Sequence, residues 1–236
     1  MSTTSIPLPS EGAPQGEAVA HVHEHDPHQR HHFKTMEQQF DTSKIGMWLF
    51  LATEILLFGG LFVGFGMMQN RYPREFVEAH THLTRWQGAL NTMVLLFSSW
   101  TMVLGVQAAK KGDNKKLMKF LAITMVCGLI FLTIKYFEYA HKWHEGWLPG
   151  IFYSATGDSI PGSHGYSTFF AFYFMMTGLH GIHIIVGIGV MLWLFRRAWR
   201  NEFSASYYTP VELSGLYWHL VDIIWIYLFP LFYLIK

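Results

Sequence analysis

The chain has 236 residues, of which 51% are hydrophobic and only 14% are charged. An ordinary soluble domain carries about 25% charged residues, so this composition is that of a membrane protein. The formal net charge of +1 gives no electrostatic reason to expect a nucleic-acid partner. The single cysteine, Cys127, lies in an apolar run, which excludes an internal disulfide and a cysteine metal cluster.

Residues 1–40 are rich in Pro, Ser, Gly, Glu and His. They contain too little apolar surface to offset the entropy cost of ordering the chain, so we expect a disordered tail. The tail holds a histidine tract of the kind that captures transition metals. No acidic or cysteine residues fix a coordination geometry, so we interpret the tract as part of a polar arm. Its members are His21, His23, His25, His28, His31 and His32.

Five apolar stretches follow the tail, each at or above the ~20 residues that a helix needs to cross a bilayer. Backbone polar groups in hydrocarbon must be paired within their own segment, so these stretches should be α-helices. We therefore predict an all-α, five-helix transmembrane domain over residues 41–236. The expected spans are 45–68, 88–109, 117–140, 166–195 and 212–235.

The Lys and Arg residues between the spans predict the orientation of the chain. The larger group lies in the tail and in the second and fourth loops: Arg30, Lys34, Lys44, Lys110, Lys111, Lys115, Lys116, Lys119, Arg196, Arg197 and Arg200. The smaller group lies on the other side: Arg71, Arg74, Arg85, Lys142 and Lys236. The positive-inside rule then places the N-terminus in the cytoplasm and the C-terminus outside.

Ionisable residues inside the spans are the strongest functional signal, because charge is expensive in a membrane. Counting along the spans puts Glu54, His180, His183, His219 and Asp222 near the middle of the bilayer. A spacing of three residues places His180 with His183 on one helical face, and His219 with Asp222 on another. We expect these carboxyl and imidazole groups to satisfy one another where the helices meet.

Lys135 and Glu138 are also three residues apart, near the outer end of the third span. An internal ion pair lowers the energetic cost of both charges. We interpret the two residues as a self-neutralising pair that faces a neighbouring helix. A proton or ion route is the alternative.

Three intramembrane histidines, His180, His183 and His219, raise the question of heme or metal. Bis-histidine heme needs axial ligands on opposite sides of the iron, and a dinuclear carboxylate site needs repeated Glu-x-x-His patterns. The sequence shows neither, so we expect no metal or heme in this chain. It also shows no nucleophile or nucleotide motif, so we expect no catalytic residue.

Five motifs follow one another along the chain: IGMWLFLATEILLFGGLFVGF, LNTMVLLFSSWTM, KYFEY, HGYSTFFAFYFMMTGLHGIHIIVGIGVMLWLFRR and GLYWHLVDIIWIYLFPLFYLI. From about Lys44 to the C-terminus the sequence resembles subunit III of the heme-copper cytochrome c oxidases. The two N-terminal helices of the seven-helix members have no counterpart. The chain is therefore similar to the short, five-helix bacterial form, located in the bacterial inner membrane.

The resemblance implies a non-catalytic accessory subunit, with heme and copper in the partner subunits. Subunit I, which houses the oxygen-reducing centre, is the expected main contact, followed by subunit II and small subunits. A supercomplex with a quinol:cytochrome c reductase is left open. The implied role is to stabilise subunit I and to support proton uptake during oxygen reduction and proton translocation.

In members of this family the buried glutamate of the first motif reacts with hydrophobic carbodiimide, and here that position is Glu54. We expect Glu54 to be neutral or hydrogen-bonded and to tune hydration and packing near subunit I. The resemblance also implies bound phospholipids. The residues suited to the membrane interface are Trp48, Trp86, Trp100, Arg196, Arg197 and Arg200.

Three alternatives stay open. The same architecture serves quinol oxidases, and a related subunit accompanies nitric oxide reductases. An autonomous proton or ion transporter is the alternative of another class, although the sequence shows neither two matching halves nor paired Gly/Pro-interrupted spans. The electron donor is not identified by this sequence.

Overall fold

The computed structural model describes residues 35–148 and 163–234, and helices make up almost all of them. They are α1 (Met36–Arg71), α2 (Pro73–Ala79), the 3₁₀ helix η1 (His80–His82), α3 (Arg85–Lys110), α4 (Asn114–His144), α5 (Ser163–Trp199) and α6 (Thr209–Tyr233). Five of these helices, all except the short α2 and η1, are long and apolar enough to cross a membrane. The predicted all-α, multi-pass membrane architecture is confirmed.

The helices are longer than most of the predicted spans. The stretches 88–109 and 117–140 lie inside α3 and α4, which continue beyond them at both ends. Helix α6 differs, because it ends at Tyr233 instead of at residue 235. Hydropathy locates only the part of a helix that sits in hydrocarbon, whereas the ends are set by capping groups and turns.

Helix α1 begins earlier than the sequence predicted. The expected tail ran to residue 40, but α1 starts at Met36. The Thr35 side chain accepts a hydrogen bond from the backbone N–H of Gln38, and Glu37 lies in the first turn, where a negative charge favours a helix. This capping signal overrides the polar composition. The histidine tract lies outside the described residues.

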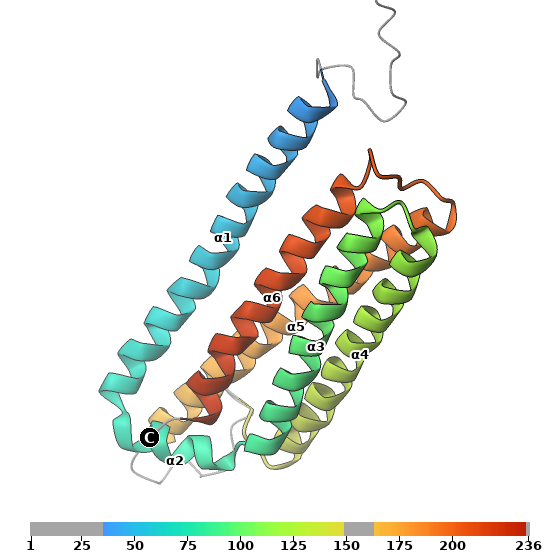
Figure 1. Cartoon of the computed structure of the whole chain (residues 1–236). Helices are drawn as coiled ribbons and strands as arrows, with labels where there is room; N and C mark the ends of the chain where they lie inside the picture. The colour runs from blue at the N-terminus through green and yellow to red at the C-terminus, as the bar shows by residue number, and fades with distance from the viewer. Residues whose placement is uncertain (1–34, 149–162, 235–236) are drawn as a thin grey trace, which may run out of the picture.

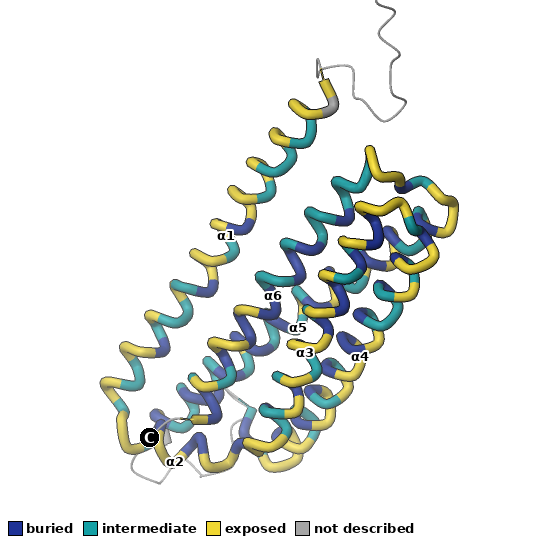
Figure 2. Tube along the Cα trace, in the orientation of Figure 1, coloured by how far each residue is buried: buried dark blue, intermediate teal, exposed yellow. Residues whose placement is uncertain are grey.

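Four helices, α3, α4, α5 and α6, pack side by side into a bundle (Figure 1). Helix α1 packs mainly against α5 and α6, and in the view it runs nearly parallel to α6 and extends beyond it at its own N-terminal end. Of the apolar part of α6, 50% is buried, compared with 17% for α1. Figure 2 shows the same contrast as dark blue along α6 and yellow along α1. Helix α6 is thus a central element, and α1 is a peripheral one.

Phenylalanine rings join α1 to the bundle at the end that carries α2, which we call the α2 end. The Phe65 ring lies 5.1 Å from Phe232 and 5.2 Å from Phe76, measured between centroids. Phe169 of α5 lies 5.4 Å from Phe76. All four side chains are fully buried. Edge-to-face aromatic contacts of this kind add to the burial of apolar area.

Gly187 marks a close approach between α5 and α6. A Cβ atom at this position would lie 2.8 Å from the Trp218 ring. We expect Gly187→Ala to lower the free energy of unfolding by about 1–3 kcal/mol, because the rigid, buried indole must shift. Thermal unfolding of the purified protein complex measures the effect. Gly189→Ala is the matched control, since a Cβ atom there meets nothing within 4 Å; equal losses in the two variants would contradict the prediction.

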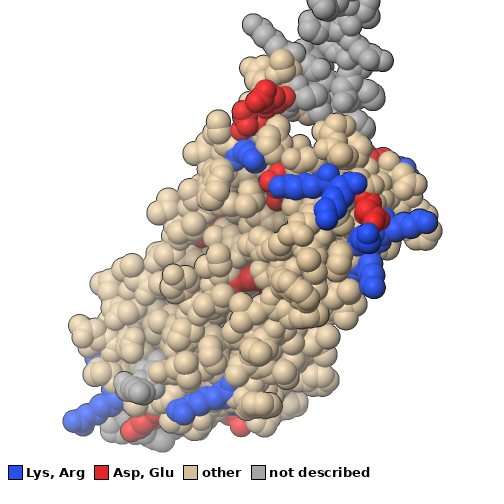
Figure 3. All heavy atoms as spheres, viewed as in Figure 1, with Lys and Arg blue, Asp and Glu red and all other residues tan. Residues whose placement is uncertain are grey.

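The charged side chains gather at the two ends of the molecule and leave an apolar middle (Figure 3). Exposed basic residues cluster at the end opposite α2: Lys110, Lys111, Lys115, Lys116, Lys119, Arg196 and Arg200. Large apolar side chains are exposed on all the long helices, for example Leu56 at 74%. An uncharged belt between two charged ends is the surface that contact with a lipid bilayer requires.

Candidate functional site

A carboxyl–imidazole pair joins α1 to α5 in the apolar middle of the protein. His183 Nε2 lies 2.8 Å from Oε2 of Glu54, and the two side chains are 14% and 16% exposed. Glu54 is therefore hydrogen-bonded, which is one of the two conditions that the sequence analysis expected of it. The contact crosses the interface between the peripheral helix and the bundle.

The second ring nitrogen of His183 shows which atoms of this pair carry hydrogens. His183 Nδ1 lies 2.8 Å from the backbone oxygen of Leu179, and a carbonyl oxygen only accepts, so Nδ1 carries a hydrogen. Either the ring is neutral and Glu54 donates its proton to Nε2, or the ring is charged and donates to an ionised Glu54. In both cases one proton lies in the contact. The two descriptions differ only in which partner holds that proton.

Aromatic rings surround this pair. The Phe58 ring lies 5.5 Å from the His183 ring, and Tyr217 donates a hydrogen bond of 3.1 Å to the His183 backbone oxygen. Low polarity strengthens the hydrogen bond and makes separation of the two partners costly.

His180 does not join His183, although the two residues share α5. Its ring is fully buried between Phe131 and Trp225, at 5.3 Å from each ring centroid. Three residues correspond to about 300° of rotation, so the two side chains diverge by roughly 60°. That offset directs one imidazole into the core of the bundle and the other toward α1.

His219 and Asp222 also have separate surroundings. His219 Nδ1 lies 2.6 Å from Ser99 Oγ of α3, and the imidazole borders a groove between α1 and α6. Asp222 is 3% exposed and lies inside the bundle. The expectation that all five groups would satisfy one another holds only for Glu54 and His183.

The predicted ion pair between Lys135 and Glu138 forms, with Nζ 2.9 Å from Oε2. Two tyrosines that the sequence analysis missed complete it. Lys135 Nζ also donates to the hydroxyls of Tyr173 at 3.0 Å and Tyr233 at 3.1 Å. Tyr233 in turn donates to the other oxygen of Glu138 at 2.5 Å. All three ammonium hydrogens have acceptors, so the two charges neutralise each other inside the bundle.

The tryptophans expected at the membrane interface are exposed: Trp48 at 61%, Trp86 at 76% and Trp100 at 58%. Arg197 differs from the expectation of headgroup contact. Its Nε donates to Glu202 at 2.6 Å, and its guanidinium lies over the Trp193 and Phe203 rings. Arg197 therefore holds the turn after α5.

Arg196 and Arg200 remain on the surface. With Leu192, Phe195 and Trp199 they line a groove of about 600 Å³ at the end of α5. Two guanidinium groups beside an aromatic ring suit the headgroup region of a bilayer.

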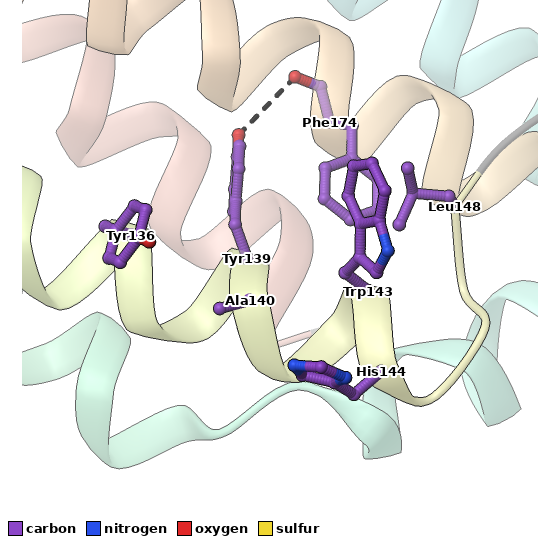
Figure 4. A pocket seen from close by; sticks show the side chains of 7 residues that line it. All are labelled: Tyr136, Tyr139, Ala140, Trp143, His144, Leu148 and Phe174. Atoms are coloured by element: carbon purple, nitrogen blue, oxygen red, sulfur yellow. Dashed lines mark hydrogen bonds between the residues drawn. The ribbon is translucent and has the colours of Figure 1, made fainter.

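Two further hollows are apolar. The groove between α1 and α6 measures about 570 Å³ and includes Trp48, Phe58 and His219 in its wall. A pocket of about 500 Å³ at the α2 end is drawn in Figure 4, with Trp143 and Phe174 along one side. Tyr139 points across α4 toward α5 in this view and donates a hydrogen bond of 3.5 Å to the Phe174 carbonyl. Neither hollow contains a nucleophile with a matched base.

His82 lies outside the membrane-spanning helices, in η1. Its ring packs 4.5 Å from Trp147, and Lys142 is close by. Burial, assisted by the positive charge of Lys142, lowers the pKa of His82. The folded protein therefore favours the neutral ring, and its free energy of unfolding decreases as the pH falls through the unfolded-state pKa of His82, which is the higher of the two.

Metal ligation is not supported by the described part of the chain. Across residues 35–148 and 163–234, no three side chains of the types His, Cys, Asp and Glu are placed to hold one ion. The histidines at 180, 183 and 219 point to three different surroundings, as described above.

Comparison with known proteins agrees with the architecture. A family model described as "Cytochrome c oxidase subunit III" matches residues 22–236, which begins closer to the N-terminus than the resemblance from Lys44. A protein of Thermostichus vulcanus named "Cytochrome c oxidase subunit 3" is 30% identical over 94% of this chain and 95% of its own length.

Two other relatives show the breadth of the group. "Quinol oxidase subunit 3" of Bacillus spizizenii is 31% identical over 84% of this chain and 91% of its own length. "Probable cytochrome c oxidase subunit 3" of Mycobacterium tuberculosis is 31% identical over 81% of this chain and 87% of its own length. These matches cover nearly the whole of each relative.

Proposed function

The chain belongs to the cytochrome c oxidase subunit III family, and from this membership we propose that it stabilises subunit I and supports proton uptake during oxygen reduction and proton translocation. As a member, it is an accessory subunit of a heme-copper oxidase and works in a complex with other oxidase subunits. We propose that those subunits, with subunit I as the main contact and subunit II and small subunits beside it, hold the heme and copper.

The observation that carries the proposal is the hydrogen bond between Glu54 and His183. It lies between the peripheral helix and the bundle, where α1 offers a large exposed apolar face to a partner. A carboxyl group that is hydrogen-bonded in apolar surroundings orders nearby water and resists separation of the helices. We propose that the pair tunes hydration and packing beside subunit I in this way.

We expect Glu54→Gln to leave assembly of the complex largely intact, because the glutamine amide can donate to Nε2 of a neutral His183. The exchangeable acid proton is lost, so proton uptake and the duration of turnover should fall. Oxygen consumption over many turnovers and proton uptake by stopped flow measure the two effects. Glu37→Gln, on the exposed first turn of the same helix, is the control. Complete loss of the complex in Glu54→Gln would refute the proposed role.

Relatives of this chain are named both cytochrome c oxidase subunit 3 and quinol oxidase subunit 3, so the identity of the electron donor must depend on other subunits. We propose a cytochrome c oxidase. Purification in mild detergent, followed by an optical spectrum and identification of the subunits, tests the assignment. Copurification of a copper-binding subunit II with a cytochrome c domain supports it, whereas copurification of subunits that bind quinol supports a quinol oxidase. A neighbouring nitric oxide reductase chain, or a colourless chain that moves protons alone in liposomes, would overturn it.

We propose that the protein lies in the bacterial inner membrane with its N-terminus in the cytoplasm. The basis is the exposed basic cluster at the end opposite α2. The same end offers the groove between Arg196 and Arg200. We propose that phospholipid headgroups occupy it.

We expect the double variant Arg196→Gln, Arg200→Gln to lose several-fold in the anionic phospholipid that copurifies with the complex, since each basic group near the surface contributes about 1 kcal/mol. Native mass spectrometry with lipid extraction measures the loss. Lys111→Gln, on the loop between α3 and α4, is the control. Equal lipid content in wild type and double variant would rule out this site.

A further inference from the structure

Asp222 is a buried acid to which the proposed function assigns no role. Its carboxyl group is 3% exposed in the middle of α6, and neither oxygen has a hydrogen-bond partner among the residues that the structure describes. An ionised carboxylate in these surroundings would be costly without a cation or several donors. The structure supplies neither to Asp222, in contrast to Glu138, which Lys135 and Tyr233 satisfy.

Two serine hydroxyls of α3 are the polar neighbours of this acid. Ser98 and Ser99 lie close enough to interact with Asp222, but neither is directed at it. Ser98 donates to the Leu95 carbonyl at 2.7 Å. Ser99 instead contacts Nδ1 of His219 at 2.6 Å. A serine hydroxyl can accept one hydrogen bond while it donates another, so a Ser99 side chain that moves toward Asp222 could bridge His219 and Asp222.

His219 connects this interior to the surface. Its side chain forms part of the wall of the groove between α1 and α6, whereas its Nδ1 reaches inward to Ser99. The groove is otherwise apolar, with Leu51, Ile55 and Phe58 in the same wall. His219 therefore lies beside the groove and also contacts Ser99 in the interior.

We propose that Asp222 is a proton-binding site inside the bundle that exchanges its proton with the α1–α6 groove through Ser99 and His219. In the loading direction, a protonated His219 gives its Nδ1 hydrogen to Ser99 Oγ while the Ser99 hydroxyl hydrogen passes to an Asp222 oxygen. His219 is left neutral and Asp222 becomes a neutral acid, so one proton moves and the charge balances. Release follows the same path in reverse.

The other groups near Asp222 come from three neighbouring helices. On α5, His180 is fully buried with both ring nitrogens unpartnered, and it packs against Trp225, one turn along α6 from Asp222. On α4, Cys127 is the neighbouring group. On α3 the neighbours are the two serines. Within residues 35–148 and 163–234 no lysine or arginine forms an ion pair with the carboxyl, so a charged Asp222 would lack a counter-ion.

Infrared spectroscopy of the purified oxidase complex tests the proposal. We expect the difference between wild type and Asp222→Asn to contain the carbonyl band of one protonated carboxylic acid, which shifts in D₂O. Replacing Ser99 by alanine, or His219 by phenylalanine, should slow that shift several-fold without removing the band. Thr133→Val is the control, because this exposed hydroxyl bonds only its own helix at Leu129.

Two results would overturn the proposal. Absence of the acid band from the difference spectrum would mean that Asp222 is ionised or paired. An unchanged rate of exchange in both relay variants would mean that the proton reaches Asp222 by another path. If Asp222→Asn does not assemble, Asp222→Glu keeps an acid at the site and should move the band instead of abolishing it.

Discussion

Replacing Lys135 with alanine is expected to lower the free energy of unfolding by about 3–5 kcal/mol, because it leaves Glu138 buried without its cation. Glu138 is 2% exposed and lies among Tyr173 and Tyr233, so water cannot replace the ammonium group. Three helices, α4, α5 and α6, meet at this cluster. The loss should therefore appear as a lower thermal stability of the whole bundle, measured by circular dichroism of the purified complex.

A paired substitution separates the charge effect from packing. We expect Lys135→Met combined with Glu138→Leu to be close to wild type in stability, because a buried ion pair can be replaced by apolar groups of similar volume at little cost. Lys119→Ala, on the exposed start of the same helix, controls for loss of a lysine. If Lys135→Ala were no worse than Lys119→Ala, the cluster would have no structural role.

Phe65→Ala is expected to cost about 3–5 kcal/mol, as is usual when a fully buried phenylalanine is truncated. Phe65 contacts rings of α2, α5 and α6 at the α2 end, and it is fully buried. The cavity should loosen α1 from the bundle. Limited proteolysis before α2, together with thermal unfolding, measures both effects.

Leu56→Ala is the matched control for this prediction. Leu56 lies on the same helix but is 74% exposed, so its truncation should change stability by no more than about 0.5 kcal/mol. A Phe65→Ala protein as stable as Leu56→Ala would show that α1 is held by contacts other than the phenylalanine cluster.

Hydropathy and spacing predicted the helices of this protein well, because a bilayer allows few alternatives to a spanning helix. The same information did not predict the additional α2 and η1, which hold residues 73–82 between α1 and α3. Pro73 at the first helical position is the signal that could have located α2. The polar composition of residues 36–40 hides the start of α1, which the Thr35 cap sets.

The candidate site was predicted less completely. The sequence placed Glu54 and His183 at similar depth, but only the packing of α1 on α5 shows that they meet. The partners of Lys135 lie 38 and 98 residues away along the chain, at Tyr173 and Tyr233. Such contacts depend on the rotation of each helix about its own axis. A segment that is apolar on all sides has no distinct apolar face, so its sequence does not define that rotation.

The peripheral position of α1 has a consequence for the order in which the protein is made. Helix α1 is synthesised first, yet its partners α5 and α6 are the last to leave the ribosome. The neighbours α3 and α4 can form their antiparallel pair as soon as Gly112 and the Asp113 cap have been translated. During synthesis Glu54 therefore lies in the bilayer before His183 has been made. A protonated, neutral carboxyl group costs less there than an ionised one, so the ability of Glu54 to keep its proton favours insertion of α1.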